Sequence, residues 1–152
     1  MKRSGIRLRL CVVLIVLNLL FIWGNSLLPG SVSGAISGWV RDILAFLFPN
    51  GAEDPDAGHG LLRKLAHFTE FACLGALLTW LLGMLQKKLW LAQLGGCIAA
   101  SLDECIQCFV PDRGPSIWDV LIDSSGVLLG VCILIIVCAV KNKKTKNFLE
   151  EL

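Results

Sequence analysis

The sequence predicts an all-α membrane protein with four transmembrane helices. Of its 152 residues, 55% are hydrophobic and only 17% are charged, and the mean hydropathy is +0.72, far above that of a typical soluble domain. A membrane-crossing helix needs about 20 mostly apolar residues. Such runs occupy residues 8–28, 66–86, 89–109 and 120–140. The length fits one domain that covers residues 1–152.

The positions of lysine and arginine predict how these helices are oriented, because cytoplasmic loops carry an excess of both. Ten of the fourteen fall on one side: Lys2, Arg3, Arg7, Arg9, Lys87, Lys88, Lys141, Lys143, Lys144 and Lys146. Both termini are therefore expected in the cytoplasm. The basic start MKRSGIRLR is also compatible with a cleaved signal peptide, but the apolar run is long and no A-x-A site follows it.

An additional helix is expected between the first two runs, on the extracytoplasmic side. Hydrophobic residues follow the helical i, i+3, i+4, i+7 spacing at Ile36, Trp39, Val40, Ile43, Leu44 and Leu47. The pattern predicts an amphipathic helix over residues 35–48 that lies in the outer interface, or a re-entrant segment packed on the bundle. Pro49 ends it.

Polar and ionisable residues collect at the ends of the runs that are expected to face outward. On the second run, Lys64, His67 and Glu70 recur at intervals of three and stay near one side of a helix. The i, i+4 spacing places Asp103 with Gln107 on one face of the third run, and Asp119 with Asp123 on one face of the fourth. The full set is Lys64, His67, Glu70, Asp103, Glu104, Gln107, Arg113, Asp119 and Asp123.

These side chains are expected to face one another rather than lipid. An ionisable group at the centre of a bilayer costs about 2.5–3.5 kcal/mol, so the set predicts a polar pocket that opens outward. The hairpin PDRGPS, which contains Arg113, would cover it. The alternative is a structural network that only joins the helices.

The cysteines and glycines favour packing roles. The seven cysteines are odd in number and lie mostly in apolar runs, which argues against a disulfide framework and favours packing as small hydrophobic residues. The Cys105-x-x-Cys108 spacing is that of a redox or zinc pair, but no second pair accompanies it. Gly126 and Gly130 form a G-x-x-x-G motif, which predicts close helix packing.

Three blocks of the sequence resemble the VanZ-like family: KLAHFTEFACLGALL, DECIQCFVPDRG and DVLIDSSGVLLG. They follow that family's patterns K-x-x-H-x-x-E-[FY], D-E-x-x-Q with a downstream Arg, and D-V-x-x-[DN]-x-x-G-x-x-x-G. The stretch WGNSLLPGSVS also resembles the family's serine-bearing exit from its first span. The resemblance extends from about Trp23 to Gly130, with Asp123 where many members carry Asn.

The resemblance implies a small multi-pass protein of the cell membrane of Gram-positive bacteria. The family's namesake is associated with low-level resistance to the glycopeptide teicoplanin, without a change to the peptide terminus that the drug recognises. The family's motif positions in this chain are the polar residues already assigned to the pocket.

Three functions fit these residues. In the first, the pocket binds the head group of a membrane lipid or lipid-linked wall precursor, with Lys64, Asp103, Gln107, Arg113 and Asp123 as contacts. In the second, a membrane enzyme uses His67, Glu70, Glu104 and Asp119 for acid–base chemistry on an anionic lipid-linked substrate. A divalent cation on Glu104, Asp119 and Asp123 could assist it. The third is a scaffold. No nucleic-acid partner is expected.

Overall fold

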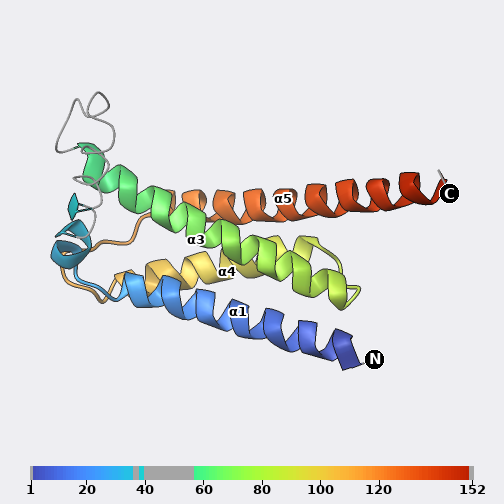
Figure 1. Ribbon diagram of the computed structural model, residues 1–152. Coiled ribbons are helices and arrows are strands. Elements are labelled where there is room, and N and C mark those ends of the chain that lie inside the picture. The colour runs from blue at the N-terminus through green and yellow to red at the C-terminus, as the bar shows by residue number, and fades with distance from the viewer. Residues whose placement is uncertain (1, 36–37, 40–56, 151–152) are drawn as a thin grey trace.

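The computed structural model describes residues 2–35, 38–39 and 57–150 and contains four long helices (Figure 1). These are α1 (Lys2–Ser26), α3 (Ala57–Met84), α4 (Trp90–Gln107) and α5 (Ile117–Glu150). No strand occurs in this part of the chain. The predicted all-α class is therefore confirmed.

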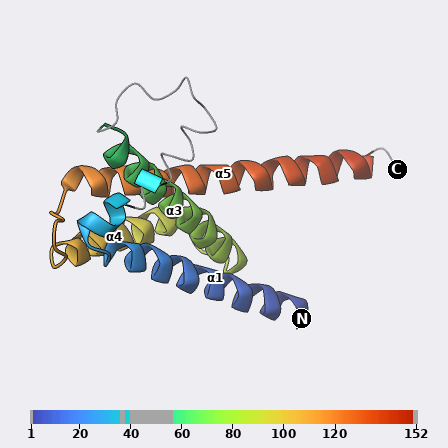
Figure 2. The same cartoon turned by 60° about the vertical axis from the view of Figure 1, so that its left-hand side comes forward.

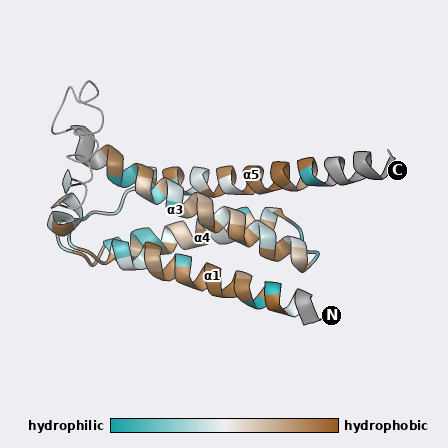
Figure 3. Cartoon of the chain, viewed as in Figure 1, coloured by the Kyte–Doolittle hydropathy of each residue, from teal (hydrophilic) through white to brown (hydrophobic). Residues whose placement is uncertain are grey.

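Three of the helices are long and apolar enough to cross a membrane. The candidate spans are Gly5–Ser26, Leu61–Met84 and Ile117–Lys141. Only 17%, 22% and 28% of their apolar windows is buried inside the protein, so most of this hydrophobic surface faces outward from the bundle. Figure 3 shows that hydrophobic residues predominate along α1 and along much of α5. The shorter α4 has 18 residues and includes two carboxylates. Its predicted crossing stays a prediction.

Three helices extend beyond the predicted apolar runs. α1 begins at Lys2 rather than near residue 8, α3 begins at Ala57 rather than near residue 66, and α5 continues to Glu150 rather than ending near residue 140. Lysine, leucine and glutamate are good helix formers, and extending an existing helix is easier than starting one. Of the expected helix over residues 35–48, residues 35, 38 and 39 are helical, and the rest lies outside the described residues.

Glycines allow α3 and α5 to pack closely, as the G-x-x-x-G motif predicts. A Cβ atom at Gly126 would overlap the carbonyl oxygen of Phe68, and one at Gly130 would overlap that of Ala72. A Cβ atom at Gly75 on α3 would likewise overlap the carbonyl oxygen of Val127. The backbones are therefore in direct contact, with no room for side chains between them.

The hydrophobic core lies along this contact and extends to α1 and α4. Its buried members include Phe71, Leu74, Val127 and, from α1, Ile22. α3 runs diagonally across the bundle, in front of α4 in the view of Figure 1, and α4 packs against α5 as well as against α3. Figure 2 shows the same bundle from a second direction. Both chain termini lie at one end of the bundle. At the other end, called the pocket end here, α1 and α4 finish and α3 and α5 begin.

The loops at the pocket end are hydrogen-bonded to each other. The backbone N–H of Gly30, just after α1, donates to the carbonyl of Pro111 at 3.1 Å. Asp112, beside it, has a positive φ of 58°, a left-handed conformation that suits a tight turn. The hairpin between α4 and α5 is thus held against the end of α1.

Candidate functional site

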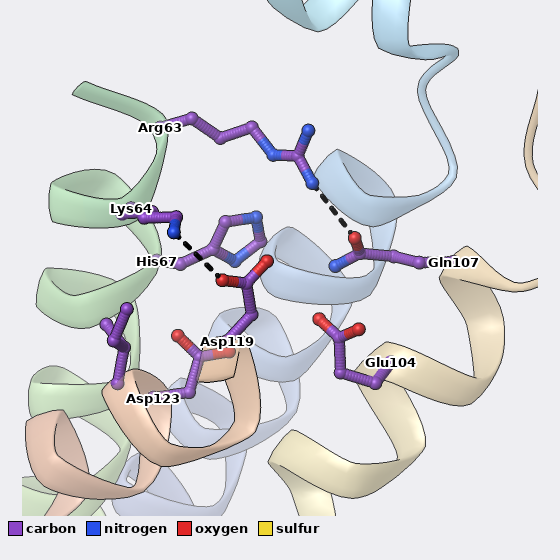
Figure 4. A pocket seen from close by; sticks show the side chains of 8 residues that line it. Arg63, Lys64, His67, Glu104, Gln107, Asp119 and Asp123 are labelled. Carbon is purple, nitrogen blue, oxygen red and sulfur yellow. Dashed lines mark hydrogen bonds and ion pairs between the residues drawn. The ribbon is translucent and has the colours of Figure 1, made fainter. Parts of the chain in front are cut away.

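A small polar pocket lies where α3, α4 and α5 meet at the pocket end (Figure 4). The side chains that line it are Arg63, Lys64, His67, Glu104, Gln107, Asp119, Ile122 and Asp123. The cavity between them measures about 10 Å³, near the roughly 10–15 Å³ that one water molecule requires. The interior has room for a water molecule or an ion, and anything larger has to bind at its mouth.

Asp103 is completely buried beneath this pocket. Its Oδ2 accepts hydrogen bonds from Ser26 Oγ and Gln107 Nε2, each at 2.8 Å. Its Oδ1 has no hydrogen-bond partner among the described residues. The carboxylate is therefore fixed through one oxygen while the other is left available.

Gln107 connects Asp103 to the mouth of the pocket. Its Nε2 donates to Asp103 and, at 3.3 Å, to Ser26 Oγ. Its Oε1 accepts a hydrogen bond from Arg63 Nη2 at 3.0 Å (Figure 4). A continuous series of side-chain hydrogen bonds thereby joins α1, α4 and α3.

His67 lies inside the pocket with 9% of its surface exposed. Its Nδ1 is 3.8 Å from Glu70 Oε2, and Glu70 Oε1 accepts a hydrogen bond from Asn25 Nδ2 at 2.9 Å. Glu70 does not line the pocket, because each interval of three rotates a side chain by about 60° around a helix. It faces α1 and supports His67 from behind.

Glu104 holds the start of α5. Its Oε2 accepts a hydrogen bond from the backbone N–H of Ser116 at 2.7 Å, just before α5 begins, where a negative charge also favours the helix dipole. Its Oε1 has no partner within the described part of the chain. In the first turn of α5, Asp119 Oδ1 is 3.5 Å from Nζ of Lys64, whose side chain is half-exposed.

Three ligand-type side chains converge at the inner end of the pocket. His67 from α3, Asp103 from α4 and Asp123 from α5 each offer one atom, and these atoms lie within 4.8 Å of one another. Asp103 and Asp123 are 0% and 2% exposed. Of the cation ligands expected from the sequence, only Asp123 belongs to this group, since Glu104 binds a backbone amide and Asp119 pairs with Lys64.

Arg113 reaches α1 instead of covering the pocket. Its Nη2 donates to the carbonyl oxygen of Asn25 at 3.2 Å. Nε and Nη1 are buried and find no acceptor in the described residues. Burial lowers the pKa of the Arg113 guanidinium, and the nearby charge of Arg63 lowers it further, whereas Asp103 and Glu104 raise it.

Four contributors to the site were not predicted: Arg63, Asn25, Ser26 and Ser116. Arg63 precedes His67 by four residues and shares its helix face, so this spacing could have identified it. Asn25 and Ser26 form a polar pair at the end of the first apolar run. Ser116 contributes through its backbone N–H, which no side-chain pattern indicates.

The prediction that cysteines pack in the core is wrong for most of them. Cys11 is buried, but Cys73, Cys105, Cys108, Cys132 and Cys138 are exposed. Hydrophobic runs do not distinguish a face that packs on other helices from one that forms the outer surface. All seven are free thiols in the structure.

The fold and site define a small, helical, multi-pass membrane protein with a polar pocket at one end of its bundle. A family model described as VanZ/LLP1 matches residues 8–138, most of the chain. The chain therefore belongs to the VanZ-like family of membrane proteins. Comparisons with curated proteins and with solved structures gave no match.

Proposed function

We propose that this protein binds the phosphate-bearing head group of a cell-envelope lipid or lipid-linked wall precursor at the extracytoplasmic face of a Gram-positive cell membrane. Head-group binding would shield the lipid from a glycopeptide such as teicoplanin, the antibiotic with which the family's namesake is associated.

The observation that carries this proposal is the lack of acceptors, among the described residues, for part of the guanidinium group of Arg113. Two of its guanidinium nitrogens have no acceptor among the described residues, although its charge is close enough to that of Arg63 to lower the Arg113 pKa. Neighbouring guanidinium groups repel each other unless an anion lies between them. The planar donor fork of arginine fits phosphate oxygens, so a phosphate would satisfy both requirements.

The surroundings of the pocket suit a lipid-borne ligand. Large apolar side chains are strongly exposed beside it: Phe109 is 89% exposed, and Ile117 and Trp118 are 71% and 70% exposed. Aromatic side chains with such exposure are typical of the membrane interface. The cavity has room for about one water molecule, so the head group would lie at its mouth, beside Arg63, whose charge is close to that of Arg113.

The distribution of positive charge supports an outward orientation of the pocket end. The basic residues at the start of α1, between α3 and α4, and near the end of α5 belong to the opposite end of the bundle. Since cytoplasmic segments are enriched in lysine and arginine, we infer that both termini are cytoplasmic and that α4 also crosses the membrane. The pocket would then open to the outside.

Binding of a lipid phosphate tests the proposal directly. We expect the detergent-purified protein to bind farnesyl phosphate, measured by calorimetry, and to bind uncharged farnesol at least 10-fold more weakly. Arg113→Gln should lower the affinity for farnesyl phosphate about 10-fold or more, because hydrogen bonds to charged groups contribute about 1.5–3 kcal/mol. Arg113→Lys keeps the charge without the donor fork and should fall between the two.

The matched control is Lys87→Gln, which removes one positive charge from the turn at the opposite end of the bundle. It should leave the affinity unchanged. Equal affinities for farnesol and farnesyl phosphate, or equal losses in both glutamine variants, would contradict head-group binding. In a Gram-positive host, wild type and Lys87→Gln should raise teicoplanin tolerance, and Arg113→Gln should not.

A membrane enzyme is the second candidate, and the pairing of His67 with Glu70 favours it. A carboxylate near an imidazole is a common arrangement for general acid–base chemistry, and Glu104 Oε1 lies unpaired in the same pocket. Mass spectrometry of farnesyl phosphate after incubation with the protein discriminates the two candidates. A product that forms with wild type but not with His67→Gln would make the protein an enzyme, whereas an unchanged lipid supports binding.

A further inference from the structure

We propose that His67, Asp103 and Asp123 bind one divalent transition-metal cation, such as Zn²⁺ or Mn²⁺, at the inner end of the pocket. The three ligands come from α3, α4 and α5, so the ion would join three helices. The inference deepens the proposed function, on which it rests for its biological role, but the ion site is argued from its own geometry.

The spacing of the ligand atoms suits an ion. They lie within 4.8 Å of one another, and ligands at about 2.0–2.2 Å from a metal are at most ~4.4 Å apart. Small rotations of the carboxylates would close this difference. The adjoining cavity of about 10 Å³ would leave a fourth position for a water molecule or a phosphate oxygen, as in zinc sites that keep one position open.

An unpartnered buried oxygen points to a missing positive partner. Asp103 is 0% exposed, and its Oδ1 has no hydrogen-bond partner in the described part of the protein. A buried polar atom without a partner is destabilising, and more so when it is charged. A cation at this point would give this oxygen a ligand bond.

The groups behind the ligands already have the arrangement that metal sites require. Ser26 and Gln107 hold Asp103 Oδ2 at 2.8 Å each, which orients the other oxygen. Glu70 Oε2 lies 3.8 Å from His67 Nδ1 and is itself positioned by Asn25. A carboxylate behind an imidazole fixes its orientation and strengthens its other nitrogen as a ligand.

The charges of the site match a divalent cation. Five carboxylates occur in it: Glu70, Asp103, Glu104, Asp119 and Asp123. Three basic side chains accompany them: Arg63, Lys64 and Arg113. With every group ionised, the site has an excess of two negative charges, which would repel a phosphate. One divalent cation cancels this excess and so makes an anionic head group acceptable.

The donor atoms favour a transition metal over magnesium or calcium. The set offers one imidazole nitrogen and two carboxylates without a thiolate. Imidazole suits zinc and iron-group metals, and carboxylates also suit manganese. Mg²⁺ and Ca²⁺ prefer oxygen ligands throughout. Zn²⁺ and Mn²⁺ are therefore the expected occupants.

Metal binding is tested with the full-length protein purified in detergent without chelators, and with the metal alone as probe. We expect about one equivalent of bound Zn²⁺ or Mn²⁺ by elemental analysis, and a rise in the melting temperature with either ion but not with Mg²⁺ or Ca²⁺. Asp123→Asn should weaken binding more than 10-fold, since even groups behind the ligands change metal affinity 10- to 100-fold. His67→Gln should have the same effect.

The matched control is Asp119→Asn, one helical turn from Asp123 and outside the ligand set, which should retain the metal. Equal losses in Asp119→Asn and Asp123→Asn would indicate diffuse attraction and overturn the site. So would a wild-type protein that neither contains nor is stabilised by Zn²⁺ or Mn²⁺. Retained metal with no affinity for farnesyl phosphate would contradict the proposed function and leave the ion site standing. Binding of farnesyl phosphate by a protein that holds no metal would contradict the ion site and leave the proposed function standing.

Discussion

Ser26 shows how one hydroxyl can connect two helices inside an apolar bundle. It is fully buried, donates to Asp103 Oδ2 at 2.8 Å and accepts from Gln107 Nε2 at 3.3 Å. Without it, Asp103 Oδ2 would depend on Gln107 alone. The hydroxyl thus stabilises a buried carboxylate that comes from a different helix.

We predict that Ser26→Ala lowers the free energy of unfolding by about 1 kcal/mol. Hydrogen bonds between membrane helices contribute about 0.6–1.7 kcal/mol, and a buried carboxylate oxygen loses one of its two donors. The measurement is equilibrium unfolding in mixed micelles. Ser101→Ala is the control, because among the described residues the exposed Ser101 hydroxyl donates to Cys97 O of its own helix and to no other helix. An equal loss in both variants would show that the interhelical bond contributes nothing.

The candidate site could be predicted within each helix but not between helices. The i, i+4 spacing correctly placed Asp119 and Asp123, which both line the pocket. It could not show that Glu70 turns to Asn25, or that Glu104 binds a backbone amide at 2.7 Å. Those partners depend on helix rotation and on the path of the hairpin, and neither property is encoded in a local spacing.

Close contact between α3 and α5 fixes the relative position of the two helices that carry most of the pocket. Gly75, Gly126 and Gly130 each lie directly against the backbone of the other helix. Backbone contact of this kind increases dispersion attraction between helices in a membrane, where no hydrophobic effect drives them together. Lys64 and Asp119, one on each helix, are thereby held within ion-pair distance.

We predict that Gly130→Ala destabilises the protein although alanine is the better helix former. The added methyl group would overlap the carbonyl oxygen of Ala72, and overpacking typically costs about 1–3 kcal/mol. Gly83→Ala is the control, since nothing lies within 4 Å of its Cβ position. There the change should be neutral or stabilising by up to about 1 kcal/mol. Thermal unfolding of both variants in detergent measures the effect, and a destabilisation confined to Gly83→Ala would contradict it.

The elements themselves follow from the sequence more closely than their ends do. Apolar runs predict a helix wherever the structure has α1, α3, α4 and α5. They do not predict that α3 starts at Ala57 or that α5 continues to Glu150, because glycines and charged residues interrupt the apolar character of AGHGLLRKL, and KNKKTKNFLE is mostly polar. Helix propagation, rather than burial, determines those boundaries.

At the scale of the whole molecule, the hydrophobic surface is on the outside. Ile6, Leu20, Phe21 and Ile136 are all between 58% and 63% exposed, and they lie on helices that qualify as membrane spans. A bundle with such an exterior is stable only where lipid or detergent covers it. Polar side chains from different helices are hydrogen-bonded to one another at the pocket end instead.

We predict that the two ends of α4 lie on opposite sides of the membrane. In a Cys105→Ser, Cys108→Ser background, a membrane-impermeant maleimide should label Gly114→Cys in intact cells. It should label Lys88→Cys only after the cells are opened. A Cβ at Gly114 has nothing within 4 Å, so a cysteine fits there. Labelling of both positions in intact cells would show that α4 does not cross the membrane.

The bonds from α1 to Glu70 and Asp103 also have a consequence for biosynthesis. Asn25 and Ser26 leave the ribosome first, and the carboxylates that they bind at 2.9 and 2.8 Å follow 45 and 77 residues later. When membrane insertion follows the order of translation, both hydrogen-bond donors are in the membrane before the acidic side chains are inserted. In a nascent chain without these two donors, both carboxylates would be inserted into lipid without a hydrogen-bond partner. Such a chain would be a substrate for quality-control proteases before its translation was complete.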